Sequence, residues 1–203
     1  MIRIVSLNLL VLYFLSFAYN YPISYKSEVS IGYDDNFMRF SNIELNDSYN
    51  KIGSSNYLGD AKTYDSGIMS TSFQIKISPK ILKKYKSNLI TKVKYNFYSS
   101  SKDKSYSSFL IRYEIRLASY QWLKFSYSLL PKYYLRTYLD RDIRPLDRYI
   151  CTFLNESFYF SYSHKIPINK TWIDYRFLIK NQFYNENFTE FDSKIRGFEA
   201  TLK

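Results

Sequence analysis

Charged side chains recur at every second residue within otherwise apolar segments of this 203-residue chain. In the stretch "SFLIRYEIRLASYQWLKFSYSLL", residues 108–130, Arg112, Glu114, Arg116 and Lys124 alternate with aromatic and aliphatic side chains. Fixed positive charge around an enclosed, hydrated space raises the local concentration of anions. The same alternation in other segments predicts one lumen-facing basic wall, formed by Lys26, Lys76, Lys92, Lys94, Arg112, Arg116, Lys124, Arg176 and Lys180.

Acidic residues balance this basic wall only in part. Glu28, Glu114 and Asp174 are the three acids in the same alternation, which leaves six positive charges uncompensated. Unpaired charges and bulky side chains would strain the narrow interior of an eight-stranded barrel, which favours a wider, wetter one. In the alternative, the charges pair with loop carboxylates and the barrel is plugged and structural. The loop carboxylates considered for that role are Asp34, Asp35, Asp140 and Asp142.

Two other groups of residues have types that could do chemistry. His164 is the only histidine, and with Ser161 or Ser163 it could support acyl transfer. The segment 34–36, Asp-Asp-Asn, carries oxygen ligands suited to Ca²⁺, although a turn at a strand end explains the same residues. The sequence shows no Gly-rich phosphate loop, no zinc-ligand spacing and no paired-carboxylate motif. We therefore predict no catalytic residue, no metal site and no cofactor.

The alternation has a period of two, which is the period of a β-strand. The predicted strands cover residues 25–34, 69–79, 89–98, 106–117, 121–136, 148–163, 172–184 and 190–203. Several run for ten or more residues, which is long enough to cross a bilayer when tilted. These features predict an all-β fold, an antiparallel up-and-down transmembrane β-barrel of about eight strands. Alternation does not say which face points outward, so a secreted soluble β-barrel or sandwich that binds an apolar ligand stays open.

The start of the chain has the features of an export signal. Residues 1–18 combine Arg3 with a following apolar run, and Ser16 and Ala18 are small residues suited to a cleavage site. We predict a cleaved signal peptide at 1–18 and one β-barrel domain at 19–203. A net charge of +11 and 20% aromatic residues would also suit single-stranded nucleic acid. Export places the protein on the wrong side of the membrane for that partner, so none is predicted.

The connections between the predicted strands fall into two sets. One set would lie outside the cell at residues 41–66, 99–105, 139–147 and 185–190. The other would lie in the periplasm at residues 79–88, 118–121 and 164–170. Aspartate and arginine alternate in the stretch "LDRDIRPLDR", residues 139–148, which predicts an exposed, self-paired loop whose arginines could also meet lipopolysaccharide phosphates.

Two stretches carry a resemblance to a known class of proteins. "SEVSIGYDDNFMRFS", residues 27–41, and "SYQWLKFSYSLLPKYYLRTYLDRD", residues 119–142, resemble uncharacterised bacterial outer-membrane β-barrel proteins. The resemblance covers about a quarter of the chain and implies a barrel in the outer membrane, with no function and no site residues attached. Such barrels usually finish on a strand with a terminal aromatic residue, whereas this chain finishes at Lys203. This departure favours the N-terminal part of a larger barrel, or a barrel that lacks the signal.

Together these observations predict an outer-membrane β-barrel of a Gram-negative-type bacterium, structural or pore-forming, that favours anionic solutes. Its expected partners are outer-membrane lipid and lipopolysaccharide, the barrel-insertion machinery and small anions. An outer-membrane acyl enzyme built around His164 is a third candidate function.

Overall fold

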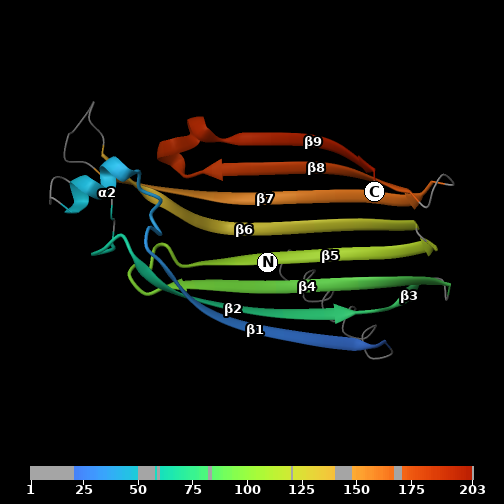
Figure 1. Cartoon of the computed structure of the whole chain (residues 1–203). Coiled ribbons are helices and arrows are strands. Elements are labelled where there is room, and N and C mark those ends of the chain that lie inside the picture. The colour runs from blue at the N-terminus through green and yellow to red at the C-terminus, as the bar shows by residue number, and fades with distance from the viewer. Residues whose placement is uncertain are drawn as a thin grey trace, which may run out of the picture.

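The eight segments with period-two alternation form the eight long strands of one antiparallel sheet. The computed structural model describes residues 21–49, 58, 60–81, 84–119, 121–139, 148–166 and 171–202. Its long strands are β1 (Ile23–Asp34), β2 (Ser66–Ile77), β4 (Tyr85–Tyr98), β5 (Tyr106–Ala118), β6 (Gln121–Leu139), β7 (Arg148–Lys165), β8 (Trp172–Tyr184) and β9 (Ser193–Leu202). They lie side by side in a curved sheet, as Figure 1 shows. The predicted signal peptide at 1–18 lies outside the described residues.

The strands pair in chain order, so the sheet is an up-and-down meander. Because the connections alternate between its two ends, those after β1, β4, β6 and β8 gather at one end, here called the loop end (Figure 1). The other end, where β2, β5 and β7 finish, is called the turn end. The connections thus fall into two sets at opposite ends of the sheet, as predicted, whereas the sides of a membrane assigned to them stay a prediction. Parts of these connections lie outside the described residues: 50–57, 59, 82–83, 120, 140–147 and 167–170.

The strand register keeps the apolar side chains of neighbouring strands on one face. Opposed residues in an antiparallel pair point to the same side of a sheet. One cross-strand row runs Tyr113, Phe125, Phe160, Phe177, Phe198 over β5 to β9 and defines the apolar face. The alternation in β7 has the opposite phase in residue number, and the register aligns its even residues with the odd residues of β6 and β8.

The adjacent row belongs to the opposite side of the sheet. It runs Glu114, Lys124, Ser161, Arg176, Glu199 over the same five strands and defines the polar face. Every second residue of each strand thus belongs to one of two chemically distinct surfaces, which a slip of one residue in register would mix.

The sheet is open in the described part of the chain. β1 pairs only with β2, and β9 pairs only with β8, so both are edge strands. The all-β, antiparallel, up-and-down architecture with eight long strands is thereby confirmed, whereas the predicted closure into a barrel is not seen. Among the described residues, no helix has the length and apolarity that a membrane-crossing helix needs.

Three short elements lie where the sequence predicted connections without regular structure. They are the helix α2 (Asn42–Tyr49), the two-residue strand β3 (Lys80–Ile81) and the 3₁₀ helix η2 (Glu186–Phe191). β3 pairs with the start of β4, so the predicted turn at 79–88 is mostly a small hairpin. Alternation cannot reveal elements this short, since they contain too few residues to show a period.

A small hydrophobic core lies at the loop end rather than within the sheet. It joins Phe37, Met38 and Phe40, which follow β1, to Tyr134 of β6; Leu58 and Ala61 complete it. The ring of Phe37 lies 5.7 Å from that of Tyr98, measured between centroids. Tyr98 belongs to the polar face, because it continues the alternation of β4 and lies opposite Ile68. The described residues of 35–65 and the loop 99–105 form this structure, here called the cap, on the polar side of the sheet.

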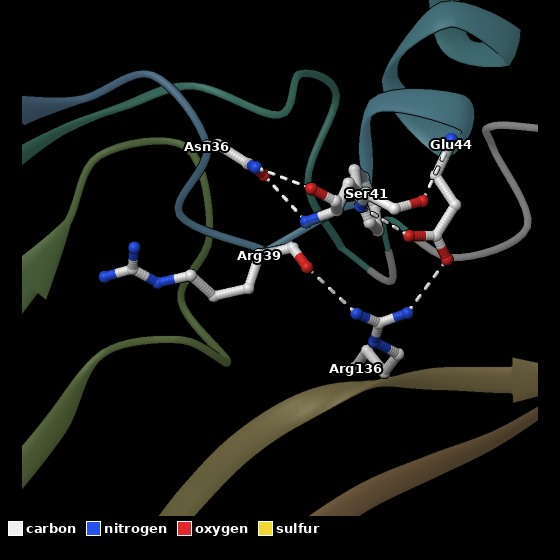
Figure 2. Close-up of polar contacts among 6 residues, drawn as sticks. Asn36, Arg39, Ser41, Glu44 and Arg136 are labelled. Atoms are coloured by element: carbon white, nitrogen blue, oxygen red, sulfur yellow. Dashed lines mark hydrogen bonds and ion pairs between the residues drawn. The ribbon is translucent and has the colours of Figure 1, made fainter.

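The cap is fastened to β6 through the start of α2. Ser41 and Glu44 form a capping box, in which each side chain accepts a hydrogen bond from the other residue's backbone amide, at 2.7 and 3.3 Å. Arg136 of β6 forms an ion pair with Glu44 at 2.9 Å and donates to the carbonyl oxygen of Arg39 at 3.1 Å (Figure 2). Asn36 accepts from the Phe40 amide and donates to its carbonyl, both at 2.8 Å, which closes the preceding turn.

Candidate functional site

The structure brings all nine residues of the predicted basic wall onto the polar face. Lys76 of β2 and Arg112 of β5 lie in one cross-strand row, with the neutral Ile90 of β4 between them. Lys124 and Arg176 flank Ser161 in the row that defines this face. The placement of Lys26, Lys92, Lys94, Arg116 and Lys180 follows from the register of their strands in the same way.

Three of the nine basic residues form ion pairs. Glu28 of β1 contacts both Lys26 and Lys92, the latter at 3.4 Å. Arg176 contacts Asp174 at 3.6 Å and Glu199 of β9 at 3.1 Å. The other six basic residues have no ion pair within the described part of the chain: Lys76, Lys94, Arg112, Arg116, Lys124 and Lys180.

The carboxylates that do pair with the wall belong to strands rather than to loops. Glu199 was missed at the sequence level, because the last segment alternates less cleanly than the others. Asp34 instead lies 3.9 Å from Arg39 and accepts a hydrogen bond from the amide of Asn36 at 3.0 Å. Asp34 and Asp35 form no ion pair with the wall in the described residues, and Asp140 and Asp142 lie outside them.

A groove of about 460 Å³ crosses the middle of the polar face over β5 to β8. Arg112, Lys124 and Arg176 supply its positive charges, and Glu114 and Asp174 supply its negative ones. Three serines of β6 and β7 line the rest of the groove, with Leu110 and Tyr159: Ser126, Ser128 and Ser161. The groove can therefore solvate ions of either sign. The surplus of positive charge on the polar face as a whole lies toward β2, β4 and β5.

Lys104 of the cap is a buried cation that the sequence placed in an exposed loop. Its side chain is 1% exposed, and its ammonium group donates to the carbonyl oxygens of Tyr134 at 3.0 Å and Leu135 at 3.3 Å. The ammonium nitrogen also lies 4.8 Å from the centre of the Tyr133 ring. Burial, together with the nearby charges of two arginines, lowers the pKa of Lys104 to about 8.

This lowered pKa makes the stability of the cap dependent on pH. Between pH 8 and the ordinary lysine pKa near 10.5, the unfolded chain binds more protons at Lys104 than the folded chain does. We therefore expect the free energy of opening the cap to increase by about 1.5 kcal/mol between pH 8 and pH 9.5, below the usual range of tyrosine ionisation. Hydrogen exchange of cap amides, corrected for the intrinsic rate, measures this change. The variant Lys104→Met should lose the increase, and Lys102→Met, at an exposed position, should keep it.

Glu44 shows how the cap holds a carboxylate in its charged form. Burial on its own would raise the pKa of Glu44, but the hydrogen bonds from Ser41 and the charge of Arg136 outweigh it and lower the pKa. The ion pair between α2 and β6 therefore stays intact well below neutral pH.

The histidine and serines considered for acyl transfer are not brought together. His164 lies opposite Ile173 on the apolar face, where its ring stacks against Tyr162 and Tyr175, with centroids 5.3 and 6.0 Å away. Ser161 and Ser163 point to the polar face, because they alternate with His164 along β7. A Ser–His pair needs the two side chains within hydrogen-bond reach, so the acyl-enzyme reading loses its geometric basis.

The residues considered for Ca²⁺ binding are engaged in a turn. Asp34 accepts from the amide of Asn36, and both polar atoms of the Asn36 side chain bond to the backbone of Phe40. The described residues contain no cluster of three or more histidine, cysteine or acidic side chains. The turn interpretation of 34–36 therefore accounts for these residues.

The polar face thus carries both the predicted basic wall and the central groove. Comparison of the chain with protein-family models, with curated proteins and with solved structures gave no match.

Proposed function

We propose that the chain is a bacterial outer-membrane β-barrel protein, with the apolar face against lipid and the polar face lining a hydrated interior that favours anions. The observation that carries this proposal is the exposed apolar face. One large hydrophobic side chain on this face in each of β4 to β8 is 40–48% exposed, and the exposed fraction reaches 83% at Ile31 on the edge strand β1; the five are Val93, Ile111, Phe125, Phe158 and Phe177. No layer of the described structure covers them (Figure 1).

An apolar surface of this extent is unusual for a protein surrounded by water. Contiguous exposed apolar patches on soluble monomers rarely exceed a few hundred Å². Here the aromatic row from Tyr113 to Phe198 crosses five strands, and further apolar rows lie on both sides of it. The alternative of a soluble barrel or sandwich requires a second layer on this face, and the described residues supply none. The hydrocarbon core of a membrane is the environment in which an exposed apolar face of this kind is most favourable.

Polar side chains interrupt the apolar face in the C-terminal strands, and the next row toward the loop end, Leu154 opposite Phe183, is apolar again. Glu156, Asn181 and Lys194 form one cross-strand row over β7, β8 and β9, on the loop side of the aromatic row. Tyr127 donates to Glu156 across β6 and β7 at 3.4 Å. In the proposed orientation this row lies at the level of the lipid headgroups, where tyrosine is also favoured.

The length of the strands agrees with this orientation. The long strands contain 10 to 19 residues, and a tilted strand needs about 9–11 to span a membrane. β6 and β7, the longest, continue beyond the apolar band, and β6 carries contacts to the cap. Lipopolysaccharide, small anions and the barrel-insertion machinery are the partners that the proposal implies.

Cell fractionation followed by detergent electrophoresis tests the location. We expect the protein in the outer-membrane fraction, with faster migration before heating than after it. Recovery in the soluble periplasmic fraction would support the soluble, ligand-binding alternative and contradict the membrane proposal.

Conductance in planar bilayers tests the interior. We expect a reversal potential that indicates anion preference, because six wall cations have no ion pair in the described residues. The variant Arg112→Glu, on the polar face, should shift the preference toward cations. The control Arg196→Glu has the same change of charge but lies on the apolar face, opposite Ile179, and should leave the preference unchanged. Cation preference in the unmodified protein would contradict the anion hypothesis.

A further inference from the structure

Three basic residues form one cross-strand row at the turn end of the polar face. Lys80 of β3 lies opposite Lys86 of β4, and Lys86 lies opposite Arg116 of β5. Side chains at opposed positions are close neighbours, and like charges there repel each other. None of the three has an ion pair with a carboxylate among the described residues. A bound anion would relieve this repulsion.

Arg116 is held in place by two contacts that leave its terminal nitrogens free. Its Nε donates to the carbonyl oxygen of Ala118 at 3.4 Å. Its guanidinium carbon lies 5.6 Å from the centre of the Trp122 ring. Within the described structure, the two terminal guanidinium nitrogens have no protein acceptor. A fixed arginine with free nitrogens is suited to bind two oxygens of one anion.

The row borders a groove of about 330 Å³ whose walls lack acidic residues. Lys80, Lys86 and Arg116 line it together with Trp122 and Asn88. Asn88 accepts a hydrogen bond through Oδ1 from Ser78 at 3.0 Å, which orients its amide nitrogen as a further donor. The groove therefore presents donors and positive charge from three strands.

The neighbouring acid does not neutralise this groove. Glu114 lies in the next row, opposite Asn88 on one side and Lys124 on the other, and it is absent from the walls of the groove. The groove also differs from the central one, where Glu114 and Asp174 stand among the basic residues.

We propose that this turn-end groove binds a phosphate group, held by Arg116 through two hydrogen bonds and by Lys80 and Lys86 through charge. Phosphate offers a tetrahedral set of oxygens with up to two negative charges, which matches one guanidinium flanked by two ammonium groups. The group comes either from a soluble phosphate or from a phospholipid headgroup. The proposal needs only the local geometry, so it stands independently of the location of the protein.

Titration of the purified full chain with inorganic phosphate, against chloride at equal ionic strength, tests the proposal. We expect tighter binding of phosphate, and binding weaker by about tenfold or more in Lys86→Gln and Arg116→Gln, since each removes a charge-assisted contact. Lys94→Gln is the matched control, because Lys94 lies on the same strand and face and is likewise without an ion pair in the described residues. Arg116→Lys keeps the charge but loses the paired donors, so its affinity for phosphate should fall between that of the unmodified protein and that of Arg116→Gln.

A second titration with short-chain phosphatidylglycerol separates the two sources. Binding of inorganic phosphate assigns the groove to a soluble phosphate. Retention of the lipid by the unmodified protein but not by Arg116→Gln, without binding of inorganic phosphate, assigns it to a headgroup. The proposal is wrong if neither probe binds better than chloride, or if Lys94→Gln weakens binding as much as Lys86→Gln does.

Discussion

The variant Phe177→Arg should insert poorly into lipid, with the free energy of folding in the bilayer reduced by about 2–4 kcal/mol. Phe177 lies within the aromatic row, 4.9 Å from Phe198 and 6.2 Å from Phe160 between ring centroids, and is 48% exposed. A guanidinium at this place would have to lie in hydrocarbon or distort the bilayer to reach water. Folding into vesicles, followed by urea titration and electrophoresis without heating, measures the loss.

The same substitution at the next residue is the control. Leu178 lies on the polar face, opposite Tyr159 and Gly197, so an arginine there points into the proposed hydrated interior. We expect Leu178→Arg to fold with little loss. If Phe177→Arg folds as well as Leu178→Arg, the apolar face does not contact lipid and the proposed orientation is wrong.

The variant Phe37→Ala should open the cap while leaving the sheet in place. Phe37 is 2% exposed at the centre of the cap core, and its backbone amide donates to the carbonyl oxygen of Tyr64 at 3.1 Å. Replacing a buried phenylalanine by alanine costs about 3–5 kcal/mol, which is large for a core of so few residues. We expect amides of 35–65 to exchange quickly, whereas those of β4 to β8 stay protected.

A substitution on the outside of the cap provides the comparison. Ile43 of α2 is 75% exposed, so Ile43→Ala removes a similar kind of side chain without leaving a cavity. Its cap should exchange as slowly as that of the unmodified protein. Simultaneous loss of protection in the cap and the sheet of Phe37→Ala would show that the two fold as one cooperative unit, contrary to our expectation.

The strands are predictable because one physical signal determines them. A strand with one apolar and one polar face must alternate with a period of two. The segment 106–117 shows this alternation in the sequence, and it forms β5 in the structure. The faces follow from the same signal, so alternation alone is enough to place the basic wall on one side of the sheet. Applied to "SYSH", residues 161–164, the same rule also separates His164 from its neighbouring serines, which a grouping by residue type and nearness in sequence overlooks.

The cap is not predictable in this way, since its parts are distant in sequence and not periodic. Phe37, Met38 and Phe40 stand in a loop-like stretch, and their contacts come from residues 58–64, β4 and β6. No pattern in the sequence predicts the contacts of Lys104, whose ammonium group is buried against carbonyl groups of β6. The apolar cluster within an otherwise polar connection is the available signal.

The phosphate groove escapes prediction for a different reason. Residues 79–88 contain four lysines and a proline, which indicate a turn, and so the alternation does not group Lys80 and Lys86 with the wall. Only the pairing of β3 with β4 and of β4 with β5 places them beside Arg116. Register is a tertiary property here, because it depends on where each hairpin reverses.

The strict order of the strands has a consequence for how this protein reaches its native state. Each long strand hydrogen-bonds only with strands next to it along the chain, so the sheet can grow hairpin by hairpin, like a zipper, with short excursions of chain at every step. Such nearest-neighbour growth keeps contact order low for an all-β protein and favours rapid assembly. The edge strands β1 and β9 are the ends of this growing sheet. Pairing β1 with β9 would have to bring together segments that are far apart in sequence, and the entropic cost of doing so rises only slowly with the length of the chain between them.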